Sequence, residues 1–161
     1  MSSGLDAGNE APDTAAPSAA GSTEGAYGEA YARSLRDPEA FWLDAASLVD
    51  WDTAPKRALD ESEAPQYHWF PDGYLNTSYN ALDRHVAAGR GDADALIYDS
   101  AMLGSTRTYT YSQLLTEVET FAGVLRGLGV EAGDRVIIYL PMIPEAVIAM
   151  LAAARLGAIH S

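Results

Sequence analysis

The stretch RVIIYLPMIPEAVIAMLAAARLGAIHS, residues 135–161, has the clearest pattern of secondary structure in this chain. Its first part, Arg135–Leu140, is a short and nearly all-apolar run, as expected for a strand that is covered on both faces. A helix is predicted over Pro144–Leu156, because proline suits the first helical position and Glu145 lies near the positive end of the helix dipole. After a glycine, residues 158–160 read as the opening of a second, parallel strand. The pattern predicts a β-α-β unit with a right-handed crossover, and therefore an α/β sheet.

The second strand of this unit is predicted to reach only its first few residues. A parallel strand of that length leaves the helix with half a surface to pack on and gives the sheet an unprotected edge. We therefore expect the chain to be the front of a larger domain, whose chemistry is carried by further polypeptide.

A hairpin and a helix are predicted before the β-α-β unit. The strands Ala95–Tyr98 and Thr108–Tyr111 are joined by a glycine-containing turn. Thr110 and Gln113 have the spacing of a capping box for the helix that follows. That helix shows one apolar face at alternating four- and three-residue steps and ends at a Gly-Leu-Gly turn; the face comprises Leu114, Val118, Phe121, Leu125 and Leu128.

Shorter elements are predicted between residues 26 and 91. Helices are expected over residues 26–36, over Glu39–Leu48 after the Asp37-Pro38 start, and over Tyr79–Val86 after a cap at Asn76 or Thr77. Residues 49–73 hold three prolines and are expected to be irregular. Large aromatic side chains around this segment need a surface to lie on, and we expect them to pack rather than to bind a ligand; they are Trp42, Trp51, Trp69 and Phe70.

Composition limits the possible functions. Ten Lys and Arg face 23 Asp and Glu, which gives a net charge of −13 and no basic footprint for nucleic acid or an anionic membrane. The apolar stretch 136–159 is interrupted by prolines and charges, so no membrane span is predicted. Cysteine is absent, so a disulfide framework and a Cys-ligated metal are excluded. With no basic start and apolar run typical of a secretory signal, a cytoplasmic protein is expected.

The sequence contains neither of two common nucleotide-binding motifs, the dinucleotide fingerprint and the lysine-containing phosphate loop. Gly127-x-Gly129-x-x-Ala132 has the spacing of a dinucleotide fingerprint, but it lies after a helix and before a strand, which is the reverse of the required order. A helix end and a turn are predicted there instead. The chain has one lysine, Lys56, which follows a proline in the irregular segment and belongs to no phosphate loop.

The remaining motifs favour structural roles. Arg90-Gly91-Asp92 is interpreted as a turn, and Asn76-Thr77-Ser78 as a helix cap rather than a glycosylation acceptor. Ser78, Asp83 and His85 do not have the offsets of a relay on a helix, and solvated or capping roles are expected for them. His68 and His160 are isolated, so the sequence supports no metal site. No catalytic, cofactor-binding or metal-ligating residue is assigned.

Two long stretches, DPEAFWLDAASLVDWDTAPKRALDESEAPQYHWFPDGYLNTSYNALDRHVAAGRGDADALIYDS and RTYTYSQLLTEVETFAGVLRGLGVEAGDRVIIYLPMIPEAVIAMLAAARLGAIHS, resemble the beginning of short-chain acyl-CoA synthetases. The propionyl-CoA synthetase branch is the most similar, with acetyl-CoA synthetases close behind. The resemblance runs from Tyr31 to Ser161, and LNTSYNALDRH and YLPMIPEAVIAMLAAARLGAIHS are its most specific parts.

The resemblance implies an N-terminal part of an adenylate-forming ligase. Such enzymes convert a short-chain carboxylate, ATP and coenzyme A to acyl-CoA, AMP and pyrophosphate through an acyl-adenylate, with Mg²⁺. Residues 1–25 lie outside the resemblance; they hold no lysine, arginine or aromatic residue, so a disordered tail is expected there. The resemblance divides the rest into an N-terminal extension of helices and irregular segments (26–91) and the incomplete start of an α/β AMP-binding domain (92–161). The family's phosphate loop, acyl pocket, coenzyme-A-contacting glycines and catalytic lysine are all expected beyond Ser161, so the chain alone is expected to be inactive.

A few matched positions keep a possible binding role. Met142, Pro144 and Glu145 follow the carboxyl end of a parallel strand, where α/β proteins place their ligands, although helix initiation also explains the last two. Arg84 and Arg107 could position a phosphate, but surface ion pairs are the simpler interpretation in so acidic a chain. The choice between propionate and acetate and the oligomeric state are not specified by these residues.

Two other classes of protein remain as alternatives. A stand-alone small α/β binding module would show a cooperative melt and a monodisperse species, whereas an open sheet edge predicts dye binding or association. A purely disordered scaffold conflicts with the strong periodicity after residue 26.

Overall fold

The computed structural model of the protein describes residues 25–161, which fall into two compact units, residues 25–38 and residues 39–161. The predicted disordered tail, 1–25, lies outside the described residues except for Gly25. In the first unit, α1 (Ala26–Arg36) begins and ends where the periodicity predicts. Tyr27 and Tyr31 stack one turn apart on α1, with ring centroids 6.2 Å apart.

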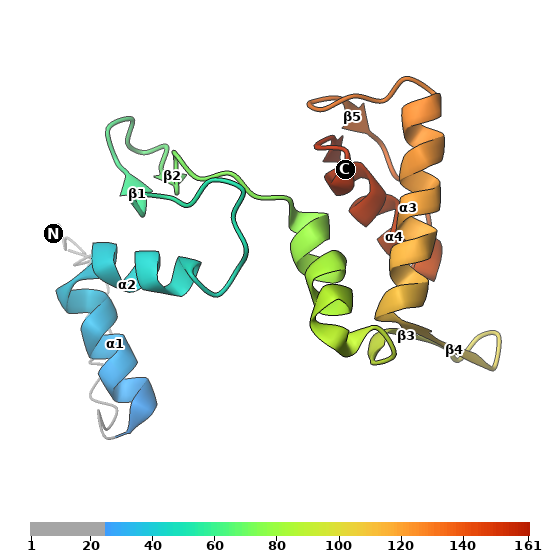
Figure 1. Ribbon diagram of the computed structural model, residues 1–161, viewed down its shortest axis with the longest axis horizontal. Helices are drawn as coiled ribbons and strands as arrows, with labels where there is room; N and C mark the ends of the chain where they lie inside the picture. Colours follow the sequence, from blue (N-terminus) through green and yellow to red (C-terminus); the bar gives the residue numbers. More distant parts are fainter. Residues whose placement is uncertain (1–24) are drawn as a thin grey trace, which may run out of the picture. The chain divides into compact units, whose positions relative to one another are not determined.

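The next helix, α2 (Pro38–Ala46), belongs to the second unit from Glu39 onward. It starts at the predicted proline and ends two residues before the expected Leu48. The following segment is largely irregular, as predicted, but it contains a small antiparallel pair, β1 (Leu59–Asp60) and β2 (His68–Trp69) (Figure 1). A two-residue ladder has no periodicity that a sequence pattern could reveal.

The aromatic side chains of this segment pack on one another, which confirms their predicted structural role. The Trp42 ring lies 5.3 Å from that of Trp69, and Phe70 lies 5.9 Å from Trp69 and 5.5 Å from Trp51. These are the edge-to-face and tilted arrangements that the ring quadrupole favours. The Trp51 indole N–H donates to the Ala46 carbonyl at 2.7 Å, which ties the end of α2 to the cluster.

Residues 77–90 form helical turns, but with wider winding than the predicted α-helix Tyr79–Val86. They comprise η1 (Tyr79–Asp83) and η2 (Val86–Arg90), both π-helical. The Asn76 side-chain oxygen accepts from the Tyr79 N–H at 3.1 Å, which confirms the cap. Gly89 takes φ 78°, a left-handed conformation that interrupts the helix where the sequence predicts its end.

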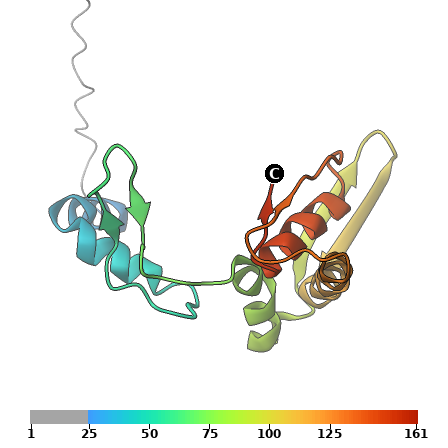
Figure 2. The ribbon, with the colours of Figure 1, turned by 90° about the horizontal axis from the view of Figure 1, so that it is seen from above.

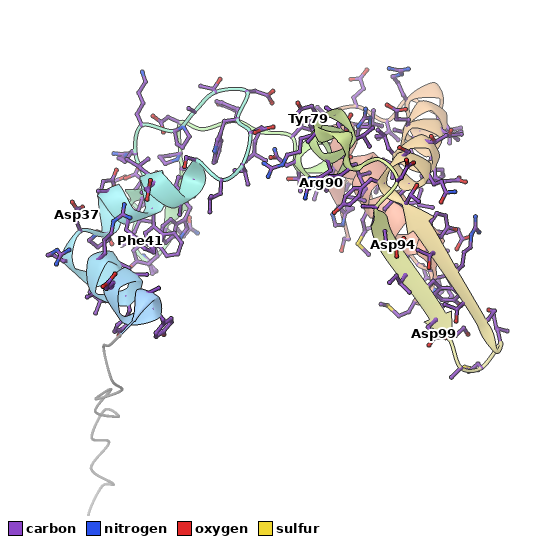
Figure 3. All side chains as sticks on the ribbon, turned by 60° about the horizontal axis from the view of Figure 1, so that its bottom comes forward. Asp37, Phe41, Tyr79, Arg90, Asp94 and Asp99 are labelled. Atoms are coloured by element: carbon purple, nitrogen blue, oxygen red, sulfur yellow. The ribbon has the colours of Figure 1, made fainter. Side chains whose placement is uncertain are left out.

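The predicted hairpin is present and longer than expected, with β3 (Asp94–Ser100) paired antiparallel to β4 (Ser105–Thr110). Figure 3 shows β3 running from Asp94 toward Asp99 near the hairpin turn. The predicted capping box is also present: the Gln113 N–H donates to Thr110 Oγ1 at 3.3 Å and the Thr110 N–H donates to Gln113 Oε1 at 3.0 Å. It starts α3 (Tyr111–Gly127), so Tyr111 belongs to the helix and not to the strand.

The β-α-β unit consists of β5 (Arg135–Val136), α4 (Pro144–Arg155) and β6 (Ile159–His160), with the two strands parallel. The α/β class is therefore confirmed. The predicted strand Arg135–Leu140 is wrong in its length, because only its first two residues lie in a ladder. Beyond them, the Ile138 N–H donates to the Ser161 carbonyl at 2.7 Å.

The core lies between α3 and α4, which pack side by side (Figure 2). Its buried members come from α3, α4, η1 and β4; they are Leu82, Tyr109, Leu114, Val118, Ala122, Leu125, Ile148 and Ala152. The predicted apolar face of α3 is thus corrected at two positions. Ala122 replaces Phe121 in the buried stripe, and Leu128 caps the helix with 77% of its surface exposed.

The β5–β6 pair has one open face. Val136 and Ile138 are partly buried, whereas Ile137 is 76% exposed and Tyr139 is 98% exposed. This alternation is that of a strand with one covered side. Parallel sheets are normally covered on both faces, so the open face has the character that the sequence predicts for an incomplete domain.

Candidate functional site

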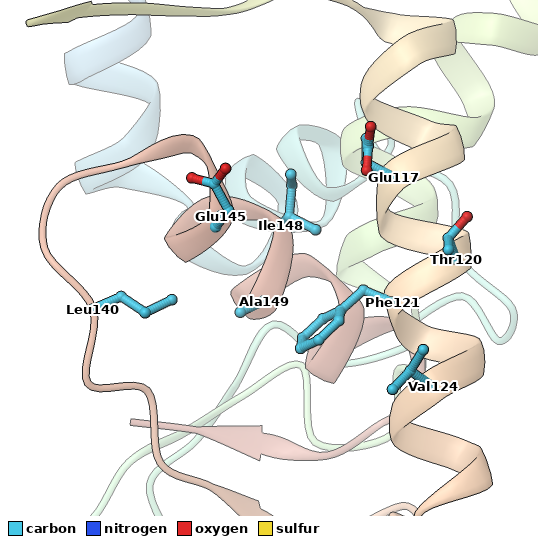
Figure 4. Close-up of a pocket in the computed structure, with 8 residues that line it drawn as sticks. All are labelled: Glu117, Thr120, Phe121, Val124, Leu140, Glu145, Ile148 and Ala149. Carbon is cyan, nitrogen blue, oxygen red and sulfur yellow. The ribbon is translucent and has the colours of Figure 1, made fainter.

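A groove between α3 and α4 is the strongest candidate site in the described part of the chain (Figure 4). It has a volume of about 340 Å³. Its walls are mostly apolar and come from both helices and from the segment after β5; they are Thr120, Phe121, Val124, Leu140, Ile148 and Ala149. Two carboxylates, those of Glu117 and Glu145, complete the lining.

Helical spacing places these side chains. On α3, Glu117, Phe121 and Val124 follow one another at four and three residues, so they lie on one face of the helix. On α4, Glu145 and Ile148 are three residues apart and lie in the first turns of the helix. This face of α3 is adjacent to the buried stripe of Leu114, Val118, Ala122 and Leu125.

The segment between β5 and α4 supplies the third wall. Ile143 is extended (φ −126°, ψ 159°) at the N-cap, and Pro144 then begins α4 at the predicted position. Leu140 reaches the groove from this connection, as Figure 4 shows. Of the three residues that the sequence singled out after the strand, only Glu145 lines the groove, since Pro144 is buried and Met142 is almost fully exposed.

The phenol of Tyr109, a residue of β4, lies within electrostatic range of the two carboxylates that line the groove. Burial raises the pKa of its phenol; Arg107 acts in the opposite direction, and the nearby carboxylates of Glu145 and Glu117 raise it further. The Arg107 guanidinium carbon lies 4.2 Å from the centroid of the Tyr109 ring, a cation–π arrangement. The surface ion pair expected for Arg107 is therefore wrong, since the ring takes its place.

A polar junction lies at the C-terminal end of α4, around Arg155. The groove residues of α4 lie in its first turns. Arg155 donates through Nη1 to Asp83 Oδ2 at 2.7 Å and through Nη2 to Asp83 Oδ1 at 2.8 Å. Its Nη2 also donates to Glu119 Oε1 at 2.9 Å. The Asn76 side-chain N–H donates to the Arg155 carbonyl at 3.1 Å. The hydrogen bonds to Asp83 raise the pKa of Arg155, so the guanidinium is a permanent cation of this junction.

The three residues considered as a relay have separate environments. Ser78 is fully buried and its hydroxyl has no hydrogen-bond partner among the described residues. Asp83 pairs with Arg155, while the His85 ring packs 4.9 Å from that of Tyr111 and its Nδ1 contacts Arg90. The solvated or capping roles expected of Ser78 and Asp83 are therefore wrong, because the fold buries one and pairs the other.

The other motif residues lie in turns and surface contacts. Gly129 has φ 91° and its N–H donates to the Arg126 carbonyl at 3.0 Å, which confirms the predicted helix end. Gly91 and Asp92 form the predicted turn. Arg84 donates to Asn80 Oδ1 at 3.1 Å and lies 3.7 Å from Asp50, as expected of a surface ion pair.

Within residues 25–161, no group of acidic, histidine or cysteine side chains is placed to hold a metal ion. Over the same residues, no helix has both the length and the apolar character needed to cross a membrane. The sequence analysis did not predict the wall of the groove that α3 supplies. The pattern that could have predicted it is the presence on α3 of Val124, an apolar residue outside the buried stripe.

Two family models match the chain in tandem. The model described as the acetyl-coenzyme A synthetase N-terminus matches residues 27–81, and the model described as AMP-binding enzyme matches residues 83–161. The junction formed by Asn76, Asp83 and Arg155 thus joins residues of both matched regions.

Curated relatives carry related names. The chain is 55% identical over 137 residues to an acetyl-coenzyme A synthetase of Thiobacillus denitrificans, covering 84% of this chain and 21% of that protein. It is 47% identical over 137 residues to the mitochondrial acyl-CoA synthetase short-chain family member 3 of Bos taurus, covering 85% of this chain and 20% of that protein. This chain therefore spans about a fifth of the length of these relatives.

A solved structure has the same fold. Acetoacetyl-CoA synthetase from Streptomyces lividans matches with a TM-score of 0.73 and 35% sequence identity. The match covers 86% of this chain and 21% of that one.

Proposed function

We propose that this chain, which matches the acetyl-coenzyme A synthetase N-terminus over residues 27–81 and AMP-binding enzymes over residues 83–161, supplies the N-terminal part of an AMP-forming acid–CoA ligase. The complete enzyme would activate a short-chain carboxylate, propionate or acetate, with ATP and transfer the acyl group to coenzyme A. Its products would be acyl-CoA, AMP and pyrophosphate.

The described residues do not fit the binding of ATP and Mg²⁺. Transfer of a nucleotide to a carboxylate needs cations and backbone donors around the phosphates. The single lysine, Lys56, lies in the irregular segment, where its backbone N–H donates to the Asp72 carboxylate. We therefore assign the ATP, Mg²⁺ and coenzyme A sites to polypeptide other than residues 25–161.

The role that we assign to this chain is that of a scaffold. Residues 26–91 would form an extension that lies on the large domain, and residues 92–161 would form the start of that domain. The observation that carries this proposal is the hydrogen bond from the Asn76 side chain, in the first matched region, to the backbone carbonyl of Arg155, in the second. The Arg155 guanidinium also pairs with Asp83, at the start of the second region. A cytoplasmic location is part of the proposal, in keeping with the acetyl-coenzyme A synthetases of bacteria among the relatives.

A chimera tests the proposed function. Residues 27–161 would replace the matching region of the Thiobacillus denitrificans enzyme, and thioester formation from acetate or propionate, ATP and coenzyme A would be measured. We expect the folded chimera to form the thioester. A chimera with native circular dichroism and no thioester formation would contradict the proposal.

A further inference from the structure

The segment between α2 and η1 forms a loop whose two ends are held together. The Thr53 N–H donates to the Tyr74 carbonyl at 3.1 Å, and the Tyr74 N–H donates to the Thr53 carbonyl at 2.9 Å, which makes a closed antiparallel bridge. Trp51 packs on Gly73 beside this bridge, so closely that a Cβ added at Gly73 would lie 2.6 Å from the Trp51 ring. Loops whose ends lie close together and whose side chains pack on one another are compact units. We call residues 49–75 the strap and residues 76–161 the body.

The strap packs on its own side chains and on α2. Its aromatic cluster is described above, and Ala58, at its centre, is 1% exposed. The Ala58 N–H donates to Glu39 Oε1 of α2 at 2.8 Å, and the Phe70 N–H donates to the Ala58 carbonyl at 2.8 Å. By contrast, the core between α3 and α4 takes its buried members from residues 82–152 of the body. Because the strap and the body have separate cores, the strap can open while the body stays folded.

One side chain of η1 holds the strap to the body at two points. Asn80 Oδ1 accepts from the Asp50 N–H at 2.8 Å, and Asn80 Nδ2 donates to the Asp50 carbonyl at 2.8 Å. The amide thus satisfies both backbone groups of one strap residue, as a partner strand would. Arg84 reinforces the contact, since its Nη1 donates to Asn80 Oδ1 at 3.1 Å and to the carbonyl of Leu48, just before the strap, at 3.1 Å.

We propose that the strap opens and closes on the body as one unit, and that Asn80 is the residue that holds it closed. Asp52 of the strap lines a polar pocket of about 370 Å³ together with Asp83 and Arg155 of the body. In the closed state the strap therefore forms one wall beside the Arg155 junction. In the open state that side of the junction is exposed to solvent. The proposal does not depend on the acid–CoA ligase function.

Amide hydrogen exchange of the full 161-residue chain, followed by NMR, tests the proposal. The reporters in the strap are the amides of Thr53, Phe70 and Tyr74, each of which donates to a backbone carbonyl of the same segment. The amides of α3 report on the body. In the unmodified chain we expect the three strap amides to share one protection factor, lower than that of the α3 amides, as amides of one cooperative unit do.

Three variants separate opening of the strap from unfolding of the chain. Asn80→Ala removes both bonds to Asp50, and we expect about tenfold faster exchange of the strap amides with less than a twofold change in α3. Gly73→Ala weakens the closure from within the strap, because the added Cβ meets Trp51, and should accelerate the same three amides. Gly123→Ala is the matched control, since a Cβ added there meets nothing within 4 Å, and it should leave the strap amides unchanged.

Each of three results would overturn the proposal. The first is equal acceleration of the strap and α3 amides by Asn80→Ala and by Gly73→Ala, which would mean that the chain opens only as a whole. The second is faster exchange at Thr53 and Tyr74 without Phe70, which would mean that the bridge frays and the strap is not one unit. The third is unchanged exchange of the strap amides in Asn80→Ala, which would mean that other contacts hold the strap closed.

Discussion

Arg155 and Asp83, 72 residues apart in the chain, form a bidentate ion pair with N–O distances of 2.7 and 2.8 Å. The pair joins the last turn of α4 to η1, and both side chains keep a quarter or less of their surface in contact with solvent. Planar, two-point pairing of this kind fixes orientation as well as distance. Both residues belong to the region that matches AMP-binding enzymes, and the Asn76 side-chain N–H, from the first matched region, donates to the backbone carbonyl of the same Arg155 at 3.1 Å.

Removal of this pair should destabilise the chain. Asp83→Ala leaves the Arg155 guanidinium with one acidic partner, Glu119, and should lower the free energy of unfolding by about 1.5–3 kcal/mol, the range for hydrogen bonds to charged groups. Urea denaturation measures the change. Arg126→Ala, a change of an arginine in the last turn of α3, is the control and should cost less than about 0.5 kcal/mol. Equal costs for Asp83→Ala and Arg126→Ala would show that the junction holds nothing together.

Two leucines of the same predicted stripe should differ sharply. Leu114 is 3% exposed in the core, so Leu114→Ala should lower the free energy of unfolding by about 2–5 kcal/mol. Leu128 is the exposed C-cap of α3, so Leu128→Ala should lower the free energy of unfolding by less than about 0.5 kcal/mol. Chemical denaturation of the two variants gives both values. A large cost at Leu128 would mean that polypeptide or a second copy covers it in solution.

The capping box of α3 should contribute measurably to stability. Thr110→Ala removes the acceptor of the Gln113 N–H and should cost about 1 kcal/mol. Thr110→Ser keeps a hydroxyl at the same position and should restore most of the loss. The midpoints of thermal unfolding report both changes. If the serine variant is as unstable as the alanine variant, the hydroxyl is not the stabilising group.

Acidification below neutral pH should destabilise the chain through His85. Burial lowers the pKa of this imidazole, and Arg90 and Arg84 lower it further, while Asp50 opposes them. The folded state therefore binds a proton less readily than the unfolded state, whose histidine pKa is about 6.5. Stability is unaffected by this group above that pH and falls as the pH decreases through it.

The measurement is the urea midpoint at pH 7.5 and at pH 5.5. We expect the decrease to be smaller in His85→Gln than in the unmodified chain. His160→Gln, at an exposed position of β6, should leave the decrease unchanged. A decrease that His160→Gln reduces and His85→Gln does not would contradict the assignment.

Local signals predicted much of this fold. The capping box at Thr110, the proline start of α4 and the glycine end of α3 are all set by a few adjacent residues, and each lies where the sequence places it. The β-α-β unit follows in the same way, from one apolar run and one amphipathic helix. By contrast, Phe121 and Ala122 both suit a helix interior, and only the packing of α4 decides which one is buried.

The groove and the polar junction could not be predicted for the same physical reason. Both bring together residues far apart in the chain: Glu117 and Glu145 line the same groove, and Asp83 pairs with Arg155 at the junction. The length of β5 also depends on a distant segment. Residues 137–140 can continue the ladder only where a partner strand pairs with them.

We propose that residues 27–161 form the N-terminal scaffold of an acid–CoA ligase and leave the chemistry of ATP to other polypeptide. The decisive experiment is ATP–pyrophosphate exchange with acetate and propionate, measured on the isolated chain and on the chimera side by side. We expect exchange by the chimera and none by the isolated chain. Exchange by the isolated chain, or a natively folded chimera without exchange, would refute the proposal.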